Sequence, residues 1–421
     1  MNLSLYSWIL RLALPLVLLR LYWRSLRAPL YRRRVAERLA LGETPPADVW
    51  VHAVSVGEVQ AAERLVRHLL ERDPPLRVLV TTTTPTGAAR LADLFGQRVV
   101  HRYTPYDLPE IVGRFLARVR PRLLIVMETE IWPNTLDLCA RRGIPAILAN
   151  ARLSARSARG YARLAGLTRR TFARFDRIAA QSEPDAARFV ALGADPARVV
   201  VTGSVKFDLR QTPDLAELTG SLRRLWGVER PVWVAASTHE GEERQVLEAH
   251  RQVLESVPRA LLVLVPRHPE RFERVAALVA RQGFGLVRRS SRQVCGPQTQ
   301  VFLGDSMGEL AAMLAGADVA FIGGSLVPTG GHNPLEAAAV GVPVVLGPHT
   351  FNFAAISALM LNAGAAVRVA DASGLAEAVT VWLADGAERA RVGALGRALV
   401  ERNRGALDRL VRLVEGCLAA T

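Results

Sequence analysis

Residues 49–58 read Val49-Trp50-Val51-His52-Ala53-Val54-Ser55-Val56-Gly57-Glu58. An apolar, β-branched run comes first, and a serine, a glycine that allows a tight turn and a glutamate follow it. This order is typical of a buried strand that turns sharply into a helix, with polar side chains at the carboxyl end of the strand. The segment therefore predicts one strand–helix unit of a parallel α/β fold, with Glu58 in the first turn of the helix.

The same unit recurs along the chain, because short β-branched runs alternate with longer amphipathic stretches rich in alanine and leucine. In the first half the predicted strands are Val49–Ser55, Arg77–Thr83, Leu123–Met127, Ala146–Ala149, Ile178–Ser182 and Val199–Gly203. In the second half they are Val232–Ser237, Leu261–Pro266, Val301–Leu303, Val319–Ile322 and Val344–Gly347. Continuous apolar strands between helices predict parallel sheets that are covered on both faces. Residues 209–227 carry no strand pattern, so we place the boundary between two doubly wound domains near them.

The composition narrows the class of protein. The chain has 421 residues, more than one hydrophobic core usually supports. Hydrophobic residues make up 50% and charged residues 22%, which excludes a disordered or collagen-like chain. The cysteines Cys139, Cys295 and Cys417 are far apart in the sequence. This spacing argues against a disulfide framework and a cysteine zinc site, and it favours a reducing compartment.

Arginine supplies almost all of the positive charge, because Lys206 is the only lysine in a chain of net charge +15. A P-loop needs a lysine directly after its glycines, whereas this lysine lies in Ser204-Val205-Lys206-Phe207, so a P-loop is excluded. A single lysine among arginines indicates a position that requires a compact ammonium group. Chance retention of this lysine is the alternative.

The first forty residues differ from the rest, since they hold eight arginines and one acidic residue, Glu37. Residues 3–19 are apolar apart from Ser4, Ser7 and Arg11, and aromatic residues flank them. This run falls short of the ~20 apolar residues that span a bilayer, and no small-residue cleavage site follows it. We expect an anchor that lies in or dips into the membrane, with arginines on anionic lipids and the remaining chain in the cytoplasm. A buried core helix is the alternative.

Polar residues gather where the predicted strands of the first half end. The stretches are Ser55–Glu58, Glu128–Asn134, Asn150–Ser154 and Thr202–Asp208. The carboxyl ends of parallel strands are where open α/β domains bind ligands. Glu58 is a candidate general base, and a partner of the helix dipole is the structural alternative. Glu128 and Glu130 leave a buried strand beside Trp132, and either could be the working carboxylate.

The second half carries a denser set of such stretches. They are Ser237–Glu243, Pro266–Arg271, Gly304–Glu309, Gly323–Ser325 and Gly330–Glu336. His239 and Glu240 resemble half of a zinc-protease motif, but its second histidine is missing, so no zinc site is predicted. Glycines allow close approach of the backbone, and we expect a phosphate at the start of the helix that Pro334 begins. Glu336 would accept hydrogen bonds from ribose hydroxyls.

Together these stretches resemble the Kdo (3-deoxy-D-manno-octulosonic acid) transferases, a family of GT-B glycosyltransferases. The N-terminal segment and Tyr31–Leu39 resemble the family too, so the resemblance covers nearly the whole chain. It implies an α/β fold of the GT-B type, with two Rossmann-like doubly wound domains that face a cleft. The implied domains are a membrane anchor and basic segment (1–40), an acceptor-binding domain (41–212) and a CMP-Kdo-binding domain (213–421). The last helix is a candidate for packing back on the acceptor-binding domain.

The resemblance also implies an activity, the inverting transfer of Kdo from CMP-Kdo to a lipid A precursor in lipopolysaccharide core biosynthesis. This reaction belongs to the cytoplasmic face of the inner membrane, where anionic lipids would bind the anchor. Glu58 matches the family's catalytic base, and Glu128 and Lys206 match positions that stabilise the transition state. The residues that match the CMP-binding segments are Arg267, His268, Met307, Gly308, Glu309, Asn333, Pro334, Leu335 and Glu336. The leaving CMP carries one phosphate and no DxD cluster is present in the sequence. We therefore expect no metal cofactor. We also expect no nucleic acid as a partner.

Three other functions fit parts of the sequence. A GT-B enzyme that uses a UDP-sugar would share the motifs of the second half. A serine hydrolase would use Ser306 of Gly304-Asp305-Ser306-Met307-Gly308, with Asp318 and His332 following in the order of a triad. That function leaves the motifs of the first half unexplained. A non-catalytic protein that binds membrane surfaces or nucleic acid fits the net charge of +15, but such proteins rarely carry a glycine-rich site flanked by acids.

Overall fold

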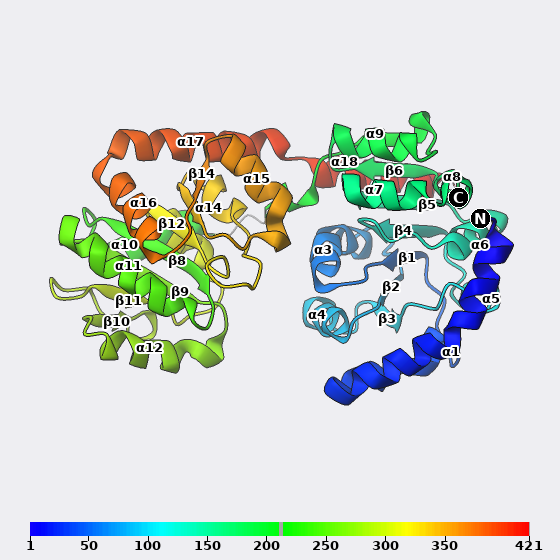
Figure 1. Ribbon diagram of the computed structural model, residues 1–421, viewed down its shortest axis with the longest axis horizontal. Helices are drawn as coiled ribbons and strands as arrows, with labels where there is room; N and C mark the ends of the chain where they lie inside the picture. Colours follow the sequence, from blue (N-terminus) through cyan, green and yellow to red (C-terminus); the bar gives the residue numbers. More distant parts are fainter. Residues whose placement is uncertain (210–213, 421) are drawn as a thin grey trace. The chain divides into compact units, whose positions relative to one another are not determined.

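The computed structural model describes residues 1–209 and 214–420, and the chain forms two compact units. Unit 1 comprises Met1–Asp208 and Arg404–Thr421, and unit 2 comprises Leu209–Asn403 (Figure 1). The domain boundary expected between residues 212 and 213 lies outside the described residues. The C-terminal segment of the chain thus belongs to the same unit as the N-terminal half.

Unit 1 contains a seven-stranded parallel sheet in the order β3-β2-β1-β4-β5-β6-β7 (Figure 1). Its strands are β1 (Val49–His52), β2 (Val78–Thr82), β3 (Val100–Tyr103), β4 (Leu123–Met127), β5 (Ala146–Ala151), β6 (Arg177–Ala180) and β7 (Val199–Val201). Its helices are α1 (Leu3–Arg27), α2 (Val35–Arg38), α3 (Val56–Leu70), α4 (Pro85–Phe95), α5 (Pro109–Val119), α6 (Pro133–Arg141), α7 (Ala155–Ala162), α8 (Ala165–Phe172), α9 (Glu183–Ala191) and α18 (Ala406–Ala419). Strands β2 and β3 follow one another on one side of β1, and β5, β6 and β7 follow one another on the far side of β4. The switch point, where open α/β sheets bind ligands, therefore lies at the carboxyl ends of these two strands.

Unit 2 repeats this plan with a second seven-stranded parallel sheet, in the order β10-β11-β9-β8-β12-β13-β14. Its strands are β8 (Val232–Thr238), β9 (Leu261–Pro266), β10 (Leu286–Arg288), β11 (Val301–Leu303), β12 (Val319–Ile322), β13 (Val344–Leu346) and β14 (Ala366–Arg368). Its helices are α10 (Leu215–Trp226), α11 (Glu242–Ser256), α12 (Phe272–Arg281), α13 (Leu310–Ala315), α14 (Leu335–Ala339), α15 (Ala354–Asn362), α16 (Ala372–Ala384) and α17 (Gly386–Asn403). Here the switch point lies between β8 and β12. The predicted doubly wound α/β fold is confirmed.

Three of the four edge strands, β3, β10 and β14, were not predicted from the sequence, whereas the fourth edge strand, β7, was. Their residues are only partly buried, as in β14, where Val367 and Arg368 are exposed. An edge strand has a neighbour on one side only, so it need not carry the continuous apolar run of an interior strand. The interior strands, which are buried on both faces, were predicted in place.

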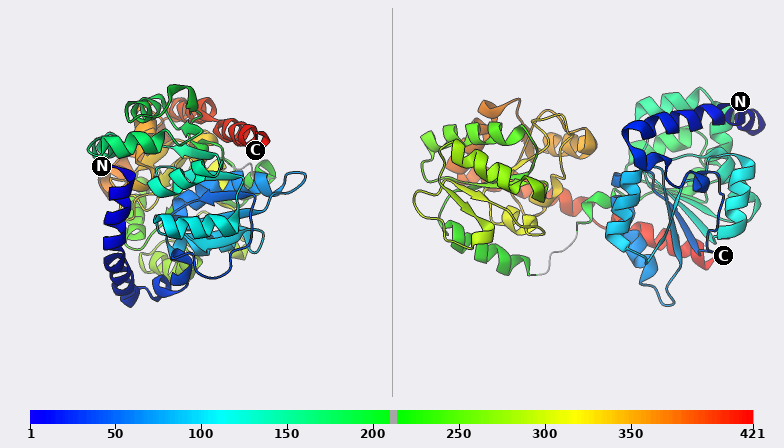
Figure 2. Two further views of the ribbon diagram at one scale, coloured as in Figure 1. Left: turned by 90° about the vertical axis from the view of Figure 1, so that its right-hand side faces the viewer. Right: turned by 90° about the horizontal axis from the view of Figure 1, so that it is seen from below.

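Side chains of unit 1 alternate between two hydrophobic clusters on the two faces of its sheet. Along β1, Val49 and Val51 enter one cluster and Trp50 enters the other. The first cluster also takes up apolar side chains of α18, which lies against the sheet (red in Figures 1 and 2). Asp208 fixes the start of α18, because its carboxylate accepts hydrogen bonds from the backbone N–H groups of Gly405 (2.6 Å) and Leu407 (2.7 Å).

The first turns of α1 dock on unit 1 through polar contacts. The Ser7 hydroxyl donates to Asn134 Oδ1 at 2.9 Å, and the Tyr6 hydroxyl donates to the buried carboxylate of Asp107 at 3.1 Å. Arg11, which interrupts the apolar run in the sequence, forms an ion pair with Glu110 at 2.9 Å. These contacts hold α1 along one side of the unit (Figure 2).

The outer side of α1 is apolar and exposed. The exposed apolar side chains of the helix include a series at helical spacing, which consists of Leu5, Trp8, Ile9, Leu12, Leu16, Leu19, Trp23 and Leu26. The helix is longer than the predicted apolar run because it continues through the arginines at 20 and 24. Among the described residues it is the one helix long and apolar enough to cross a membrane.

Candidate active site

Glu58 lies at the switch point of unit 1, one turn into α3. The Ser55 hydroxyl caps the helix and accepts a hydrogen bond from the Glu58 N–H at 3.4 Å. The carboxylate turns back toward the strand, where its Oε2 accepts from the Val54 N–H at 2.6 Å. This capping arrangement fixes the carboxylate at the carboxyl end of β1 instead of leaving it to rotate in solvent.

The surroundings of Glu58 make it a weak acid. Burial raises the pKa of Glu58 to about 8, and the negative charges of Glu130 and Glu128 contribute in the same direction, while the Val54 hydrogen bond opposes them. A base whose pKa lies near neutral pH accepts a proton efficiently and is still ionised often enough to act. The structure thus brings Glu58 close to both carboxylates of the 128–130 segment.

Glu128 follows β4 with a backbone φ of +57°, a conformation that residues other than glycine rarely adopt. Such a position costs about 1–3 kcal/mol and persists where the surrounding structure enforces it, often at functional sites. The buried carboxylate lies between two cations: its Oε2 is 2.9 Å from Arg152 Nε, and its Oε1 is 3.9 Å from Lys206 Nζ. Glu128 therefore holds two positive charges beside Glu58.

Lys206 reaches this group from η3 (Val205–Phe207), directly after β7. Asn150, another residue with positive φ (51°), holds that turn through its Oδ1, which accepts from the Val205 N–H at 3.2 Å. Burial lowers the pKa of Lys206, and the charge of Glu128 opposes this shift. The structure thus brings together Glu58, Glu128 and Lys206, the predicted catalytic residues, from three separate stretches of the sequence.

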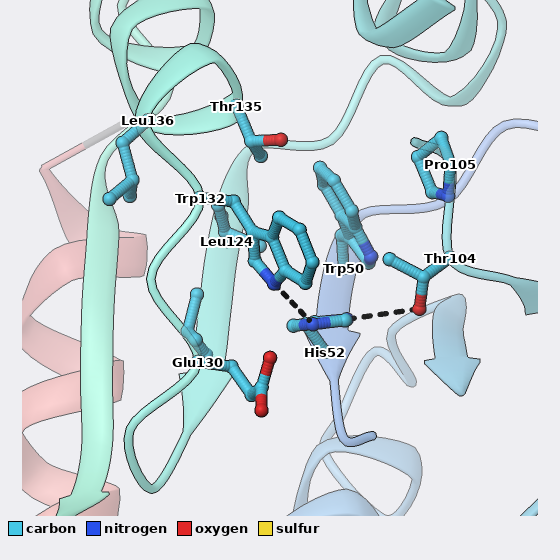
Figure 3. A pocket seen from close by; sticks show the side chains of 10 residues that line it. Trp50, His52, Thr104, Pro105, Leu124, Glu130, Trp132, Thr135 and Leu136 are labelled. Atoms are coloured by element: carbon cyan, nitrogen blue, oxygen red, sulfur yellow. Dashed lines mark hydrogen bonds between the residues drawn. The ribbon is translucent and has the colours of Figure 1, made fainter. Parts of the chain in front are cut away.

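A buried histidine on β1 supports the loop that carries Glu128 and Glu130 (Figure 3). His52 Nε2 accepts a hydrogen bond from the Trp132 indole N–H at 3.1 Å, so its proton is on Nδ1, which lies 2.9 Å from the Thr81 hydroxyl. Burial lowers the pKa of His52 to about 4, which keeps the ring neutral. No role was predicted for His52, whose one signal in the sequence is that it is a polar residue inside an apolar strand.

Glu130 lies over a small pocket beside His52 and Trp132 (Figure 3). The pocket encloses about 10 Å³, which is room for a single water molecule. Burial raises the pKa of Glu130, the Trp132 hydrogen bond lowers it, and the charge of Glu128 raises it again. Glu130 therefore shapes the electrostatics around Glu58, whereas Glu128 makes the direct ion pairs.

In unit 2 a buried carboxylate organises the glycine-rich loop after β12. Glu242 accepts hydrogen bonds from the backbone N–H groups of Gly324 (2.7 Å), Ser325 (3.1 Å) and Leu326 (3.0 Å). These N–H groups would otherwise form an anion-binding nest, so the carboxylate occupies the place of an external anion. A ligand phosphate must bind beside this loop and not on these three N–H groups.

The predicted CMP-binding residues lie at the carboxyl edge of the sheet of unit 2. Arg267 and His268 follow β9 and are exposed. Asn333 Nδ2 donates to Glu336 Oε1 at 3.4 Å, and Asn333 Oδ1 accepts from the Leu335 N–H at 3.2 Å. Burial raises the pKa of Glu336, while the Asn333 hydrogen bond and the charge of Arg267 lower it. The helix α14 begins at Leu335, one residue after Pro334, and has only five residues.

The third predicted segment, residues 307–309, follows β11, the neighbour of β9 in the sheet. Met307 is 62% exposed and Gly308 has a φ of +85°. Glu309 is already engaged: its carboxylate binds Arg289 (2.7 Å) and accepts from the Ser306 hydroxyl. The segment therefore offers an exposed thioether and a glycine turn at the same edge as Arg267.

The serine hydrolase suggested as an alternative is contradicted by these contacts. Ser306 donates to Glu309 and not to a histidine, and His332 Nε2 instead lies 2.7 Å from His239 Nε2. Asp318 precedes β12, at the opposite end of the strands, where it accepts from the Val232 N–H at 2.8 Å. The three residues of the supposed triad are thus not assembled.

Comparisons with known proteins agree with this arrangement. Residues 33–209 match the family model described as 3-Deoxy-D-manno-octulosonic-acid transferase (kdotransferase), and residues 282–398 match Glycosyl transferases group 1. The 3-deoxy-D-manno-octulosonic acid transferase of Haemophilus influenzae is 44% identical and covers 97% of both chains. That of Bordetella pertussis is 41% identical and covers 88% of both chains.

Among solved structures, UDP-GlcNAc 2-epimerase from Neisseria meningitidis covers 89% of this chain and 100% of its own, with 13% identity and a TM-score of 0.56. This likeness concerns the fold alone. The C-terminal CMP-Kdo binding domain of WaaA from Acinetobacter baumannii is 36% identical over 45% of this chain and 100% of its own, with a TM-score of 0.44. The two doubly wound units form a GT-B fold. The chain therefore belongs to the 3-deoxy-D-manno-octulosonic acid transferase family of glycosyltransferases.

Proposed function

We propose that this Kdo transferase moves Kdo from CMP-Kdo to a hydroxyl group of a lipid A precursor with inversion, and that Glu58 is the general base. The observation that supports this assignment is the fixed, buried carboxylate of Glu58, whose pKa is raised to about 8 at the switch point of unit 1. The ionised carboxylate takes the proton of the acceptor hydroxyl while the hydroxyl oxygen attacks the anomeric carbon of Kdo. The bond from that carbon to the phosphate oxygen breaks, and CMP leaves.

Glu128 and Lys206 stabilise the charges of this step. Lys206 supplies a compact ammonium for negative charge, and Glu128 keeps it in place through the 3.9 Å ion pair. The Glu128 carboxylate also favours positive charge on the sugar ring as the donor bond breaks. Fixed side-chain charges stabilise the leaving phosphate, as a metal ion does for diphosphate donors. We therefore propose that transfer continues in the presence of a chelator.

The donor nucleotide binds at the carboxyl edge of unit 2. Arg267 and His268 offer cationic and polar groups to the phosphate. The half-buried Glu336 accepts hydrogen bonds from the ribose, and its pair with Asn333 keeps the carboxylate oriented. The segment Met307–Glu309 and residues 333–335 complete the cytidine site. Unit 1 then binds the acceptor, and unit 2 binds the donor.

The pH dependence of the reaction tests the role of Glu58. The base must be ionised, so kcat/KM should rise with pH through an apparent pKa of about 8. In Glu130→Gln a negative charge that raises this pKa is gone, and the rising limb should move to lower pH. Measurements of kcat/KM as a function of pH for both proteins, with CMP-Kdo and acceptor, show this shift. An identical limb in Glu130→Gln would contradict the electrostatic account.

The helix α1 holds the enzyme at the membrane that contains its acceptor. Ser7, Tyr6 and Arg11 dock one side of the helix on unit 1, so its opposite, apolar side is free to enter a lipid surface. This geometry favours a helix that lies in the interface over one that spans the bilayer. Exposed arginines in the C-terminal part of α1, at 20 and 24, and after the helix, at 32 and 33, suit the anionic lipids of the cytoplasmic leaflet of the inner membrane.

Replacing exposed leucines of α1 tests this placement without touching its docking contacts. Leu12, Leu16 and Leu19 are 76%, 68% and 63% exposed, and each contributes about 1.5–3 kcal/mol when buried in an apolar phase. The triple serine variant should therefore remain in the supernatant when vesicles that contain anionic lipid are sedimented, with CMP binding unchanged. A control with Val228→Ser and Val294→Ser, exposed apolar residues outside α1, should sediment like wild type. Sedimentation of the triple variant with the vesicles would contradict the proposal.

A further inference from the structure

Arg152 is an exposed arginine that a buried carboxylate holds in place. It follows β5 in unit 1, and its Nε lies 2.9 Å from Oε2 of Glu128. The side chain of Arg152 is 55% exposed, whereas that of Glu128 is 9% exposed. An exposed arginine that is attached to a fixed carboxylate is ordered before a ligand binds, which lowers the entropy cost of binding. The mechanism proposed above gives Glu128 a role and gives Arg152 none.

The guanidinium group of Arg152 has room for a second anion. A carboxylate at Nε occupies one edge of the planar group and leaves the end formed by Nη1 and Nη2, which can donate two parallel hydrogen bonds. Glu128 is the one carboxylate that pairs with Arg152 among residues 1–209 and 214–420. Arginine recognises phosphate and carboxylate groups in this two-pronged geometry. The end of the Arg152 side chain therefore offers a site for an oxyanion.

Hydrogen bonds fix the backbone on both sides of Arg152. The Thr129 hydroxyl donates to the Arg152 carbonyl oxygen, which ties this residue to the loop that follows β4. The Leu153 N–H donates to Asp185 at 2.9 Å, and the Leu153 carbonyl oxygen accepts from Arg188 at 3.0 Å. Asp185 also pairs with Arg188 at 3.3 Å, so its negative charge is compensated and does not compete for Arg152.

Arg152 begins a run of positive charge that continues through α7. Residues 152–163, which we call the arginine segment, contain four arginines and no acidic residue. Arg156, Arg159 and Arg163 are exposed, and none of them forms an ion pair with a residue that the structure describes. The helix α7 has eight residues and none of them is buried, so its arginines face solvent. Uncompensated positive charges at a surface attract an anionic ligand.

The arginine segment leads from the catalytic carboxylates toward the helix α1. At one end Arg152 contacts Glu128, which lies beside Glu58. At the other end α8 follows α7 directly and lies against the start of α1, where a Cβ at Gly166 would be 3.8 Å from the Met1 carbonyl oxygen (Figure 1). A lipid-anchored acceptor that enters from the side of α1 and reacts at Glu58 therefore has its head group near this segment.

We propose that the arginine segment binds a phosphate group of the acceptor, and that the guanidinium end of Arg152 makes the direct contact. The inference rests on the proposed function, since it assumes that unit 1 binds a lipid A precursor, which is a phosphorylated glycolipid. Arg156 and Arg159 contribute by attraction at longer range. Because Arg152 is attached to Glu128, a phosphate bound there places the acceptor hydroxyl near the carboxylate of Glu58. Arg152 thus selects phosphorylated acceptors and positions them.

Removing the phosphate from the acceptor separates this role of Arg152 from a structural one. We compare a lipid A precursor with the same lipid after dephosphorylation, in detergent micelles without phospholipid, and measure kcat/KM and, without CMP-Kdo, equilibrium binding to the full-length protein. The wild-type protein should prefer the phosphorylated lipid by about 10- to 100-fold, the effect of a hydrogen bond to a charged group. Arg152→Gln should lose most of this preference. Loss of the ion pair with Glu128 lowers both rates by the same factor and cancels in the ratio.

Two further variants provide the comparison. Arg141→Gln is the matched control, because Arg141 is also exposed (70%) and its Nε lies 2.7 Å from the buried carboxylate of Asp137, in the last turn of α6. This control should keep the wild-type preference. The double variant Arg156→Gln/Arg159→Gln should reduce the preference by about two- to fivefold, since it removes only charges at longer range. Melting temperatures show whether each variant is folded.

The outcomes separate the two proposals. A wild-type protein without a preference for the phosphorylated lipid, or a folded Arg152→Gln variant that keeps the full preference, would overturn the inference. Arg152→Gln should also sediment like wild type with anionic vesicles that lack the acceptor. Loss of this sedimentation would overturn the inference too, because the ligand would then be a lipid head group. A folded wild-type protein that transfers Kdo to neither lipid would contradict the proposed function instead.

Discussion

Glu58→Gln is expected to reduce the rate of Kdo transfer by about 10²–10⁴-fold, the contribution that a general base typically makes. Glutamine keeps the size of the side chain and an oxygen that accepts from the Val54 N–H, but it cannot take the proton of the acceptor hydroxyl. CMP affinity should not change, because the nucleotide site belongs to unit 2. Initial rates with CMP-Kdo and acceptor, together with CMP titrations, measure both quantities.

Two comparisons make this result specific. Glu63→Gln changes a carboxylate on the same helix that pairs with Arg67 at 3.0 Å, and it should keep activity within a few-fold of wild type. Stability should not fall in Glu58→Gln, because the raised pKa means that the folded protein disfavours the ionised carboxylate. Above the ordinary pKa of 4.5 the variant should melt at or above the wild-type temperature, and this advantage should vanish at lower pH. Near-wild-type activity of Glu58→Gln would end the assignment.

Lys206→Met is expected to lower kcat by about 10²–10³-fold, as loss of a preorganised charge at a transition state does. The Lys206 side chain is 25% exposed and its Nζ is 3.9 Å from Glu128 Oε1, so methionine leaves the buried carboxylate with Arg152 as its remaining ion-pair partner. KM for CMP-Kdo should change little, because the interaction develops with the transition state.

Lys206→Arg separates the need for a charge from the need for an ammonium. A guanidinium is a broad planar fork, and the enclosed position beside Glu128 and Arg152 fits a compact group. We expect impaired kcat although the positive charge remains. Steady-state kinetics of both variants, with melting temperatures, test this requirement. Wild-type turnover in the arginine variant would contradict it.

The interior strands could be predicted from the sequence, whereas three of the four edge strands could not. Interior strands such as Leu123–Met127 are buried on both faces and therefore carry an unbroken apolar run. The edge strand Val100–Tyr103 reads Val-His-Arg-Tyr and is largely half-buried, so no such run marks it. Likewise, α1 extends beyond Leu19 because helix formation continues through arginines that the hydropathy pattern excludes.

Residues of the candidate site could be predicted from the sequence where they follow the carboxyl ends of parallel strands, because these ends meet at one edge of the sheet. This rule selected Glu58, Glu128 and Lys206, and the structure places all three in one group. It could not find contacts that depend on side-chain direction, such as Trp132 on His52 or His239 on His332, whose partners are 80 and 93 residues apart. The positive φ of Glu128 and Asn150 is equally invisible in the sequence, since neither residue is glycine.

The most direct test of the account is the mass of the product that the purified protein makes. The wild-type protein, incubated with CMP-Kdo and a lipid A precursor, should release CMP and increase the mass of the acceptor by whole Kdo residues. Glu58→Gln should give the same product far more slowly, and omission of CMP-Kdo should give none. An acceptor of unchanged mass in the presence of the folded wild-type protein and both substrates would contradict the account.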